Sequence, residues 1–99
     1  MNRLTLKRLA LADLKSIARY TEDRWGWRQR NYYVKKLDDA FSMIAETPTL
    51  GVTCDFILQG YRKFTAQSHI IFYKIKTDGK IEVMRILHKS MDAISMFVG

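Results

Sequence analysis

Apolar and polar residues alternate with two different periods along the first half of this chain. Leu4 and Leu6 alternate with polar neighbours, which is the pattern of a short half-buried strand. The period then lengthens, and apolar residues recur at spacings of three and four, as on one face of a helix. That face consists of Leu14, Ile17, Ala18, Thr21 and Trp25. We expect a helix with Asp13 in its first turn, where a carboxylate meets the positive end of the helix dipole, and with Gly26 at its end.

A second helical face follows Gly26. It consists of Tyr33, Leu37, Ala40, Phe41 and Ile44. Pro48 ends this helix, because the residue before a proline is driven out of helical geometry. Two helices joined by a short turn predict an antiparallel hairpin, and its apolar faces need a surface to pack on.

The second half of the chain reads as strands. Residues 50–57 are irregular or a short strand, and three strand-like segments follow at 61–67, 69–76 and 81–88. Asp78-Gly79 supplies the turn between the last two, since these residues adopt positive φ angles readily. In the last strand, alternation puts Val83, Arg85 and Leu87 on one face and Met84, Ile86 and His88 on the other. Residues 90–98 predict a short terminal helix or turn.

These elements predict an α+β fold in the order β-α-α-β-β-β. The helical hairpin packs on one face of a small, mostly antiparallel sheet, and the other face is expected to be partly open to solvent or to a partner. Residues 1–99 are expected to form one domain, because the chain is too short for a second core.

Charge adds a class of partner to this picture. The chain has 17 Lys and Arg residues against 10 Asp and Glu residues, a formal net charge of +7. Such a charge accelerates encounter with acidic partners, either nucleic acid or an acidic protein segment, although solubility alone would also account for it. The hydrophobic fraction of 47% is that of a globular protein rather than a disordered one.

The sequence gives no sign of a cofactor or of a metal site. Cys54 is the single cysteine, and the two histidines and scattered carboxylates lack the spacing of zinc ligands. No phosphate loop or dinucleotide fingerprint is present. We expect a cytoplasmic protein, because the sequence shows neither a signal peptide nor an apolar stretch long enough for a membrane span.

The two histidines, which stand at predicted strand ends, are the candidates for catalysis. His69 and His88 would approach each other across the sheet. They would then form a ribonuclease-like set with Arg62, Tyr73, Arg85 and Lys89. Such a site needs a base, an acid and cations for the transition-state charge. The alternative is that both histidines hydrogen-bond the backbone at strand ends, and no Asp or Glu is evidently positioned to orient either ring.

The helical hairpin carries basic residues interleaved with aromatic ones. Representative positions are Arg19, Trp25, Arg28 and Lys35. This combination binds phosphate and stacks on bases, and it equally suits an amphipathic acidic peptide. The remaining interpretation is a solvated helix surface with Trp25 and Tyr33 in the core.

The order and spacing of several stretches resemble the ParE branch of the RelE/ParE toxin superfamily over nearly the whole chain. The most specific are Val83-Met84-Arg85-Ile86-Leu87-His88 and Met91-Asp92. The others are Ala12-Asp13-Leu14, Tyr20-Thr21, Trp25-Gly26, Asn31-Tyr32-Tyr33, Gly60-Tyr61-Arg62 and Ser68-His69-Ile70-Ile71-Phe72-Tyr73.

This resemblance implies a toxin that poisons DNA gyrase and blocks replication, without being a hydrolase. It also implies a ParD-like antitoxin that neutralises the toxin and binds operator DNA, so that DNA is met only through antitoxin or gyrase. The same superfamily contains ribosome-dependent mRNA endonucleases, which are the alternative. Against that alternative, the strand that would carry a central cleft arginine reads Ile70-Ile71-Phe72, and no tyrosine follows Tyr73.

We expect ten residues to face the target or a partner: Arg62, His69, Tyr73, Arg85, His88, Lys89, Met91, Asp92, Met96 and Phe97. Two hypotheses about this surface follow. The first assigns it to residues 85–97 together with the open face of the sheet, because the apolar residues Met91, Met96 and Phe97 lie near a basic strand end. The alternative is that these three side chains close the core. The second places Arg62 and Arg85 on neighbouring strands, where like charges are costly unless an anion lies between them. That anion would be a phosphate or an antitoxin carboxylate.

Overall fold

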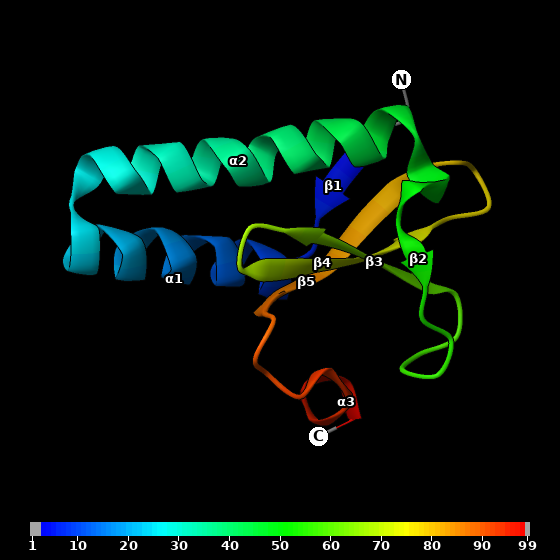
Figure 1. The fold of residues 1–99 in the computed structure, drawn as a ribbon. Coiled ribbons are helices and arrows are strands. Elements are labelled where there is room, and N and C mark those ends of the chain that lie inside the picture. Colours follow the sequence, from blue (N-terminus) through cyan, green and yellow to red (C-terminus); the bar gives the residue numbers. More distant parts are fainter. Residues whose placement is uncertain (1–2, 99) are drawn as a thin grey trace.

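A mixed sheet forms one layer of the molecule, and a long helical hairpin forms the other (Figure 1). The computed structural model describes residues 3–98. The sheet consists of β1 (Leu4–Leu6), β2 (Val52–Thr53), β3 (Tyr61–Ala66), β4 (His69–Ile75) and β5 (Ile81–His88), in the spatial order β1-β5-β4-β3-β2. Strand β1 pairs with β5 in parallel, and the other neighbours pair antiparallel. The predicted α+β class and the mostly antiparallel sheet are confirmed.

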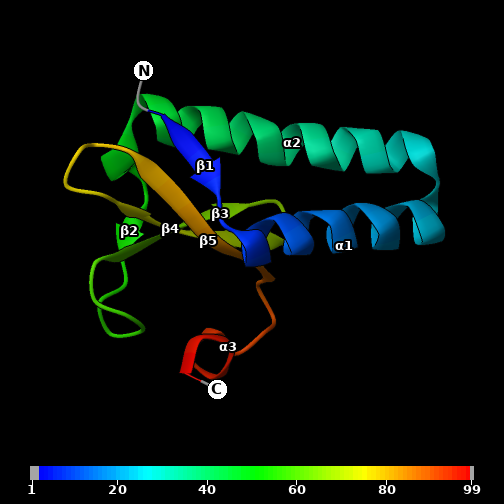
Figure 2. The same cartoon turned by 180° about the vertical axis from the view of Figure 1, so that it is seen from behind.

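The hairpin consists of α1 (Arg8–Trp25) and α2 (Trp27–Glu46), followed by the short helix η1 (Pro48–Leu50). Gly26 joins the two long helices with a φ of +91°, a conformation that glycine adopts without strain. Helix α1 begins at Arg8, so Asp13 lies well inside it and the expected first-turn role of Asp13 is wrong. Figure 2 shows from behind that the joined ends of the helices extend beyond the sheet.

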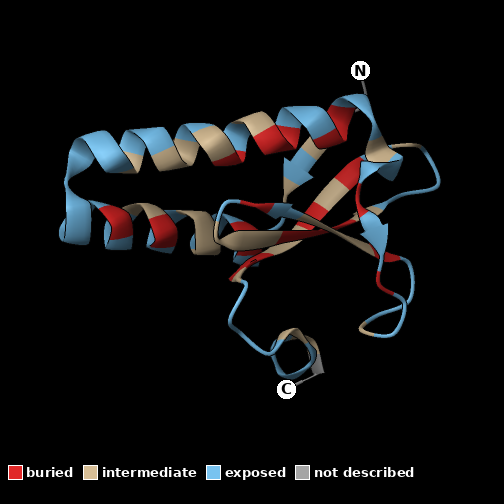
Figure 3. Cartoon of the chain, viewed as in Figure 1, coloured by how far each residue is buried: buried red, intermediate tan, exposed pale blue. Residues whose placement is uncertain are grey.

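The main core lies between the hairpin and the sheet. Its fully buried side chains include Leu37 and Ile44 of α2 and Ile71, Tyr73 and Val83 of the sheet. Figure 3 shows these buried positions as bands on the facing sides of the two layers. Burying each large apolar side chain contributes about 1.5–3 kcal/mol, so the hairpin's amphipathic pattern decides which side of each helix meets the sheet.

The other face of the sheet is partly covered, which agrees with the expectation that it is only partly open. A second cluster contains Cys54, Tyr61, Phe72 and Leu87. The terminal helix α3 (Ala93–Val98) lies below the sheet and adds Phe97, whose ring stands edge-on to Tyr61 and Phe72 at centroid distances of 5.3 and 5.2 Å (Figure 1). The segment between β2 and β3 covers this face with Ile57. None of the described helices is long and apolar enough to cross a membrane.

A bulge in β5 changes which of its side chains share a face. Phe72 pairs with Arg85 and Tyr73 pairs with Val83, so Met84 has no partner across the strand pair. The strict alternation predicted for this strand is therefore wrong. Val83 and Ile86 both join the main core, whereas Met84 and Leu87 both pack in the second cluster. The register beyond the bulge brings His88 directly opposite His69.

Candidate functional site: a groove beneath the helical hairpin

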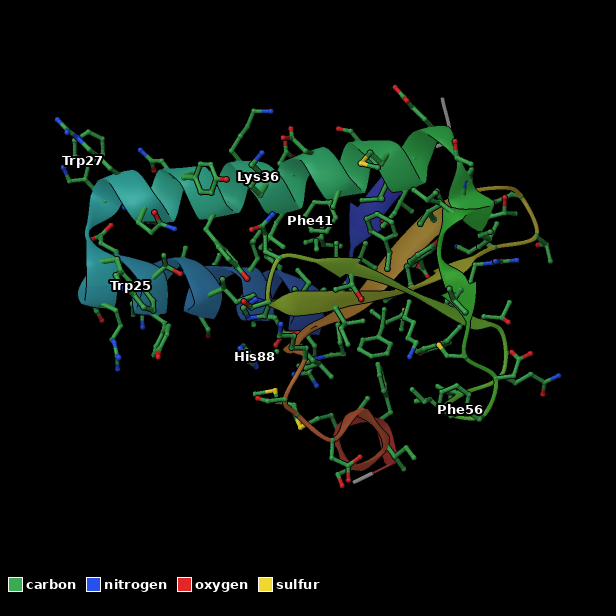
Figure 4. All side chains as sticks on the ribbon, in the orientation of Figure 1. Trp25, Trp27, Lys36, Phe41, Phe56 and His88 are labelled. Atoms are coloured by element: carbon green, nitrogen blue, oxygen red, sulfur yellow. The ribbon has the colours of Figure 1, made fainter. Side chains whose placement is uncertain are left out.

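A groove of about 850 Å³ runs under the overhanging hairpin to the ends of β4 and β5. Its walls come from α1 and α2 on one side and from the strand ends and the following turn on the other. The lining residues are Ser16, Ile17, Tyr20, Thr21, Trp25, Gln29, Tyr33, Ser68, His69, His88, Ser90 and Met91. Figure 4 shows Trp25 at the end of α1 and His88 below the hairpin, whereas Trp27 and Lys36 lie on the upper side of α2.

The groove lining is uncharged although the chain as a whole is strongly basic. None of its twelve residues is Lys, Arg, Asp or Glu. The walls are instead aromatic and aliphatic side chains with several hydroxyl groups. A cleft of this size and composition suits an apolar segment of a partner that also offers a few hydrogen-bonding groups.

The mouth of the groove is aromatic and cationic. Tyr20 and Trp25 stand edge to face with ring centroids 6.1 Å apart, and both are more than half exposed. The guanidinium carbon of Arg24 lies 5.6 Å from the Tyr20 centroid and 5.5 Å from the Trp25 centroid. Within the described residues, Arg24 has no carboxylate partner, so its charge is available to an acidic partner.

The two histidines meet at the inner end of the groove, as the sequence predicted. Their ring centroids are 5.2 Å apart, and the rings are nearly perpendicular at 85°. Nδ1 of His69 lies 2.6 Å from the Tyr33 hydroxyl, and Nδ1 of His88 lies 2.7 Å from Oγ of Ser90. The partners of both rings are thus hydroxyl groups rather than carboxylates, together with the main-chain amide of Ser90.

Burial lowers the pKa of His69 from its ordinary value of 6.5 to about 4. The neighbouring His88 lowers this pKa further, and Asp13 partly opposes the shift. His69 is therefore uncharged at neutral pH. An imidazole that is uncharged and hydrogen-bonded to a tyrosine is a poor candidate for the cation or the acid of a ribonuclease site.

The depressed pKa of His69 predicts acid sensitivity. Between pH 6.5 and 4 the unfolded chain binds a proton that the folded chain does not bind, so stability falls as pH falls through this window. We expect a loss of about 1–2 kcal/mol, because water still screens the half-buried ring. Urea unfolding at pH 7 and pH 4.5 measures this loss of stability. His69→Gln is the control, because it lacks the imidazole that binds the proton. An equal pH dependence in both proteins would contradict the assignment.

Tyr73 and Arg62, two other members of the ribonuclease-like set, lie away from the histidine pair. Tyr73 is fully buried in the main core; its hydroxyl donates to the Pro48 carbonyl at 2.6 Å and accepts from the Gly51 amide at 2.8 Å. The expectation that Tyr73 faces a target or partner is therefore wrong. Arg62 donates to the Gly51 carbonyl at 2.8 Å, beside Tyr73 rather than beside the histidines. Lys89 lies just past β5, where its amide donates to the Ser68 carbonyl.

Arg62 and Arg85 do not lie on neighbouring strands, because β4 separates β3 from β5. Arg85 instead pairs with Asp13 of α1: its Nε and Nη2 donate to the two carboxylate oxygens at 2.8 and 2.9 Å. The Ile86 amide donates to the same carboxylate at 2.9 Å. The hypothesis of an anion between two adjacent arginines is thus wrong. This clamp was missed from the sequence, because residues 13 and 85 share no local pattern.

The C-terminal residues divide into an anchor and an exposed surface. Phe97 packs in the second cluster, and Asp92 caps α3 by accepting from the Ile94 amide at 3.1 Å. Met91 and Met96 are exposed, and Met91 also lines the groove.

The four basic and aromatic positions singled out on the hairpin lie on more than one side of it. Trp25 lines the groove. Arg28 lies outside it, with its guanidinium carbon 5.2 Å from the centroid of the Trp27 ring. Lys35 pairs with Asp39 and lines a second hollow of about 630 Å³ between the helices. Arg19 is an exposed residue of α1. Among the described residues, no group of three or more His, Cys, Asp or Glu side chains is arranged to hold a metal ion.

Comparisons with known proteins agree with this fold. The family model for the ParE toxin of type II toxin-antitoxin system, parDE, matches residues 4–93. Toxin ParE1 of Mycobacterium tuberculosis is 42% identical over 91 residues, which cover 92% of this chain and 93% of that protein. Toxin ParE1 of Caulobacter vibrioides is 40% identical over 88 residues, which cover 89% of this chain and 90% of that protein.

A solved structure described as the chromosomal ParDE TA system from P. aeruginosa shares the fold. It superposes with a TM-score of 0.77 at 20% identity and covers 89% of this chain and 96% of that chain. The likeness in fold and the sequence matches thus agree over nearly the whole chain. This chain belongs to the ParE toxin family of type II toxin–antitoxin systems.

Proposed function

We propose that this toxin inhibits DNA gyrase and thereby blocks replication. The observation that carries the proposal is the family match over residues 4–93, which includes both the helical hairpin and the strand end with the histidine pair. On this proposal the toxin acts in the cytoplasm, where gyrase works on DNA, and it meets DNA only through gyrase or through an antitoxin.

Action by binding, rather than by hydrolysis, is supported by how the candidate catalytic groups are used. Tyr73 is buried, Arg85 is paired with Asp13, and His69 is uncharged at neutral pH. ParE toxins are in general not enzymes, and we assign no catalytic residue to this chain. The alternative remains a ribosome-dependent mRNA endonuclease, for which His88, Lys89 and Arg62 would have to act without these groups.

We assign the groove beneath the hairpin to a ParD-like antitoxin. The uncharged lining accepts apolar side chains, while Arg24 at the mouth and the net charge of +7 favour acidic residues at the edge of the same segment. An amphipathic segment that folds as it binds combines both features. The bound antitoxin would then cover Trp25 and Tyr20, which are more than half exposed in the free toxin.

The test is a supercoiling assay with purified gyrase, run beside a translation-coupled mRNA cleavage assay. We expect the toxin to stop supercoiling and to accumulate cleaved DNA, and we expect the antitoxin encoded beside it to restore supercoiling. Codon-specific cuts in mRNA without an effect on gyrase would support the endonuclease alternative instead.

The exposed surface of α3 is the proposed contact with gyrase, and Met96 tests it. Met96 is 39% exposed, so Met96→Glu should leave the melting temperature nearly unchanged. It should weaken gyrase inhibition about tenfold or more, because a charge in the centre of an apolar contact is costly. Met43→Glu is the matched control, since Met43 is also exposed but lies on α2. Equal inhibition by both variants would exclude α3 from the contact.

A further inference from the structure

The inner end of the groove holds two imidazole rings whose Nδ1 atoms are both occupied. Among the described residues, neither Nε2 atom has a hydrogen-bond partner, and both rings line the groove. A neutral imidazole carries one N–H and one acceptor nitrogen, so the partner at Nδ1 decides whether Nε2 is a donor or an acceptor. The hydrogen bonds at Nδ1 therefore determine what the groove presents to a ligand.

The tautomer of His88 follows from the main chain. The Ser90 amide lies 3.1 Å from Nδ1 of His88, and an amide N–H can only donate. Nδ1 is thus the acceptor, and the proton of the neutral ring is on Nε2. The Ser90 hydroxyl, 2.7 Å from the same nitrogen, can add a second donor without changing this result.

The tautomer of His69 follows from the two contacts of Tyr33. The Ser68 amide donates to the Tyr33 hydroxyl oxygen at 3.0 Å, which leaves the hydroxyl proton free to donate elsewhere. Nδ1 of His69 lies 2.6 Å away and is the other hydrogen-bond partner of this hydroxyl group among the described residues. We assign the Tyr33 proton to Nδ1, because the hydroxyl group then both accepts from Ser68 and donates to His69, and this assignment puts the proton of the neutral His69 ring on Nε2.

We infer that His69 and His88 form a specificity site in the groove, in which their unpartnered Nε2–H groups donate to main-chain carbonyl oxygens of the antitoxin segment. A carboxylate fits less well, because no cation lines the groove to offset its desolvation. Apolar contacts along Ile17 and Tyr20 give the segment its affinity, whereas the paired donors fix its register. This inference rests on the proposed role of the groove as the antitoxin site.

The tautomers can be measured on the free toxin. Long-range ¹H–¹⁵N correlation spectra at pH 7 distinguish Nδ1–H from Nε2–H imidazoles. We expect the neutral form of each ring to carry its proton on Nε2, and we expect Tyr33→Phe to release His69, but not His88, from this state. A ring that carries its proton on Nδ1 in the wild-type toxin would overturn the inference, whatever the antitoxin does.

Binding to the antitoxin encoded beside the toxin then tests the recognition, with His88→Phe, His88→Gln and Ser90→Ala compared with the wild type. His88→Phe keeps a ring but leaves the ligand oxygen unpaired, so we expect Kd to rise about 10- to 100-fold. The side-chain amide of glutamine can replace Nε2–H, and we expect His88→Gln to stay within about threefold of the wild type. Ser90→Ala removes a hydroxyl group that lines the groove but keeps the main-chain amide that sets the tautomer, so its loss of affinity should be smaller than that of His88→Phe.

Two outcomes of this comparison are distinguishable. Equal affinity of His88→Phe and the wild type would overturn the specificity site while leaving the antitoxin proposal intact. A wild-type toxin that does not bind the antitoxin would overturn both proposals. Thermal melting of each variant shows whether a loss of affinity comes from a loss of fold.

Discussion

Asp13→Ala is expected to lower the free energy of unfolding by about 3 kcal/mol, the cost of breaking a largely buried ion pair. The side chains of Asp13 and Arg85 are each 15% exposed, so water cannot replace the lost carboxylate fully. The substitution leaves the Arg85 guanidinium without its two acceptors and removes the acceptor of the Ile86 amide. Urea unfolding at pH 7, followed by circular dichroism, measures the change.

Asp39→Ala is the matched control for this prediction. It breaks the Lys35–Asp39 pair, whose side chains are 69% and 45% exposed, and should leave the unfolding midpoint nearly unchanged. If both variants lost the same stability, the clamp between α1 and β5 would have no special importance. Asp13→Asn should lie between wild type and Asp13→Ala, because an amide oxygen still accepts one hydrogen bond.

Gly51→Ala is expected to lower the free energy of unfolding by about 3 kcal/mol, because the added methyl group clashes with its neighbours rather than because the backbone conformation requires glycine. A Cβ atom at this position would lie 2.5 Å from the Tyr73 hydroxyl oxygen and 2.9 Å from the Lys63 carbonyl oxygen. The Tyr73 ring would have to move within a packed core and would lose its hydrogen bonds to Pro48 and Gly51. Overpacking and unpaired buried polar groups each cost about 1–3 kcal/mol.

Tyr73→Phe provides the control, because it removes the atom that an alanine at position 51 would meet first. Alone, Tyr73→Phe should be destabilising, since it leaves the Gly51 amide without its partner. The double variant should be more stable than the sum of the two single losses predicts, as for residues in direct contact. Strictly additive losses would show that the clash is relieved elsewhere.

The Asp13–Arg85 ion pair and the close packing of Gly51 against Tyr73 hold the two sides of the groove at a fixed separation. Asp13 joins α1 to β5 by accepting from the Ile86 amide, two residues before His88. Beyond Asp13, α1 continues as one wall of the groove. Gly51 and Tyr73 join the connection after α2 to the centre of the sheet. The groove is thus preformed by interactions that lie outside it, which reduces the ordering cost when a partner binds.

The periodicity of apolar residues was sufficient to predict the helices and strands. Apolar residues at spacings of three and four can form one buried stripe only on a helix, and Gly26, Pro48 and Asp78-Gly79 mark real ends and turns. The α+β class follows from these elements, because a helical hairpin with one apolar side must pack on a sheet. The resemblance in motif order added the toxin family, which the comparisons confirm.

Other predictions failed because they depend on register and on distant contacts. Alternation along β5 gave the wrong faces, since the bulge at Met84 shifts every later side chain by one position. Tyr73 was expected to face a partner, but its hydroxyl finds acceptor and donor groups in the core. Residue type alone does not reveal whether such partners will be present.

The sequence by itself determined the helices, the strands, the turns and the family, because local spacing and motif order carry that information. Only the tertiary structure decided which polar groups meet. It paired Asp13 with Arg85, and it brought the Tyr33 hydroxyl of α2 within hydrogen-bonding distance of His69. These contacts join residues far apart in the chain, and their geometry exists only once the hairpin has packed on the sheet.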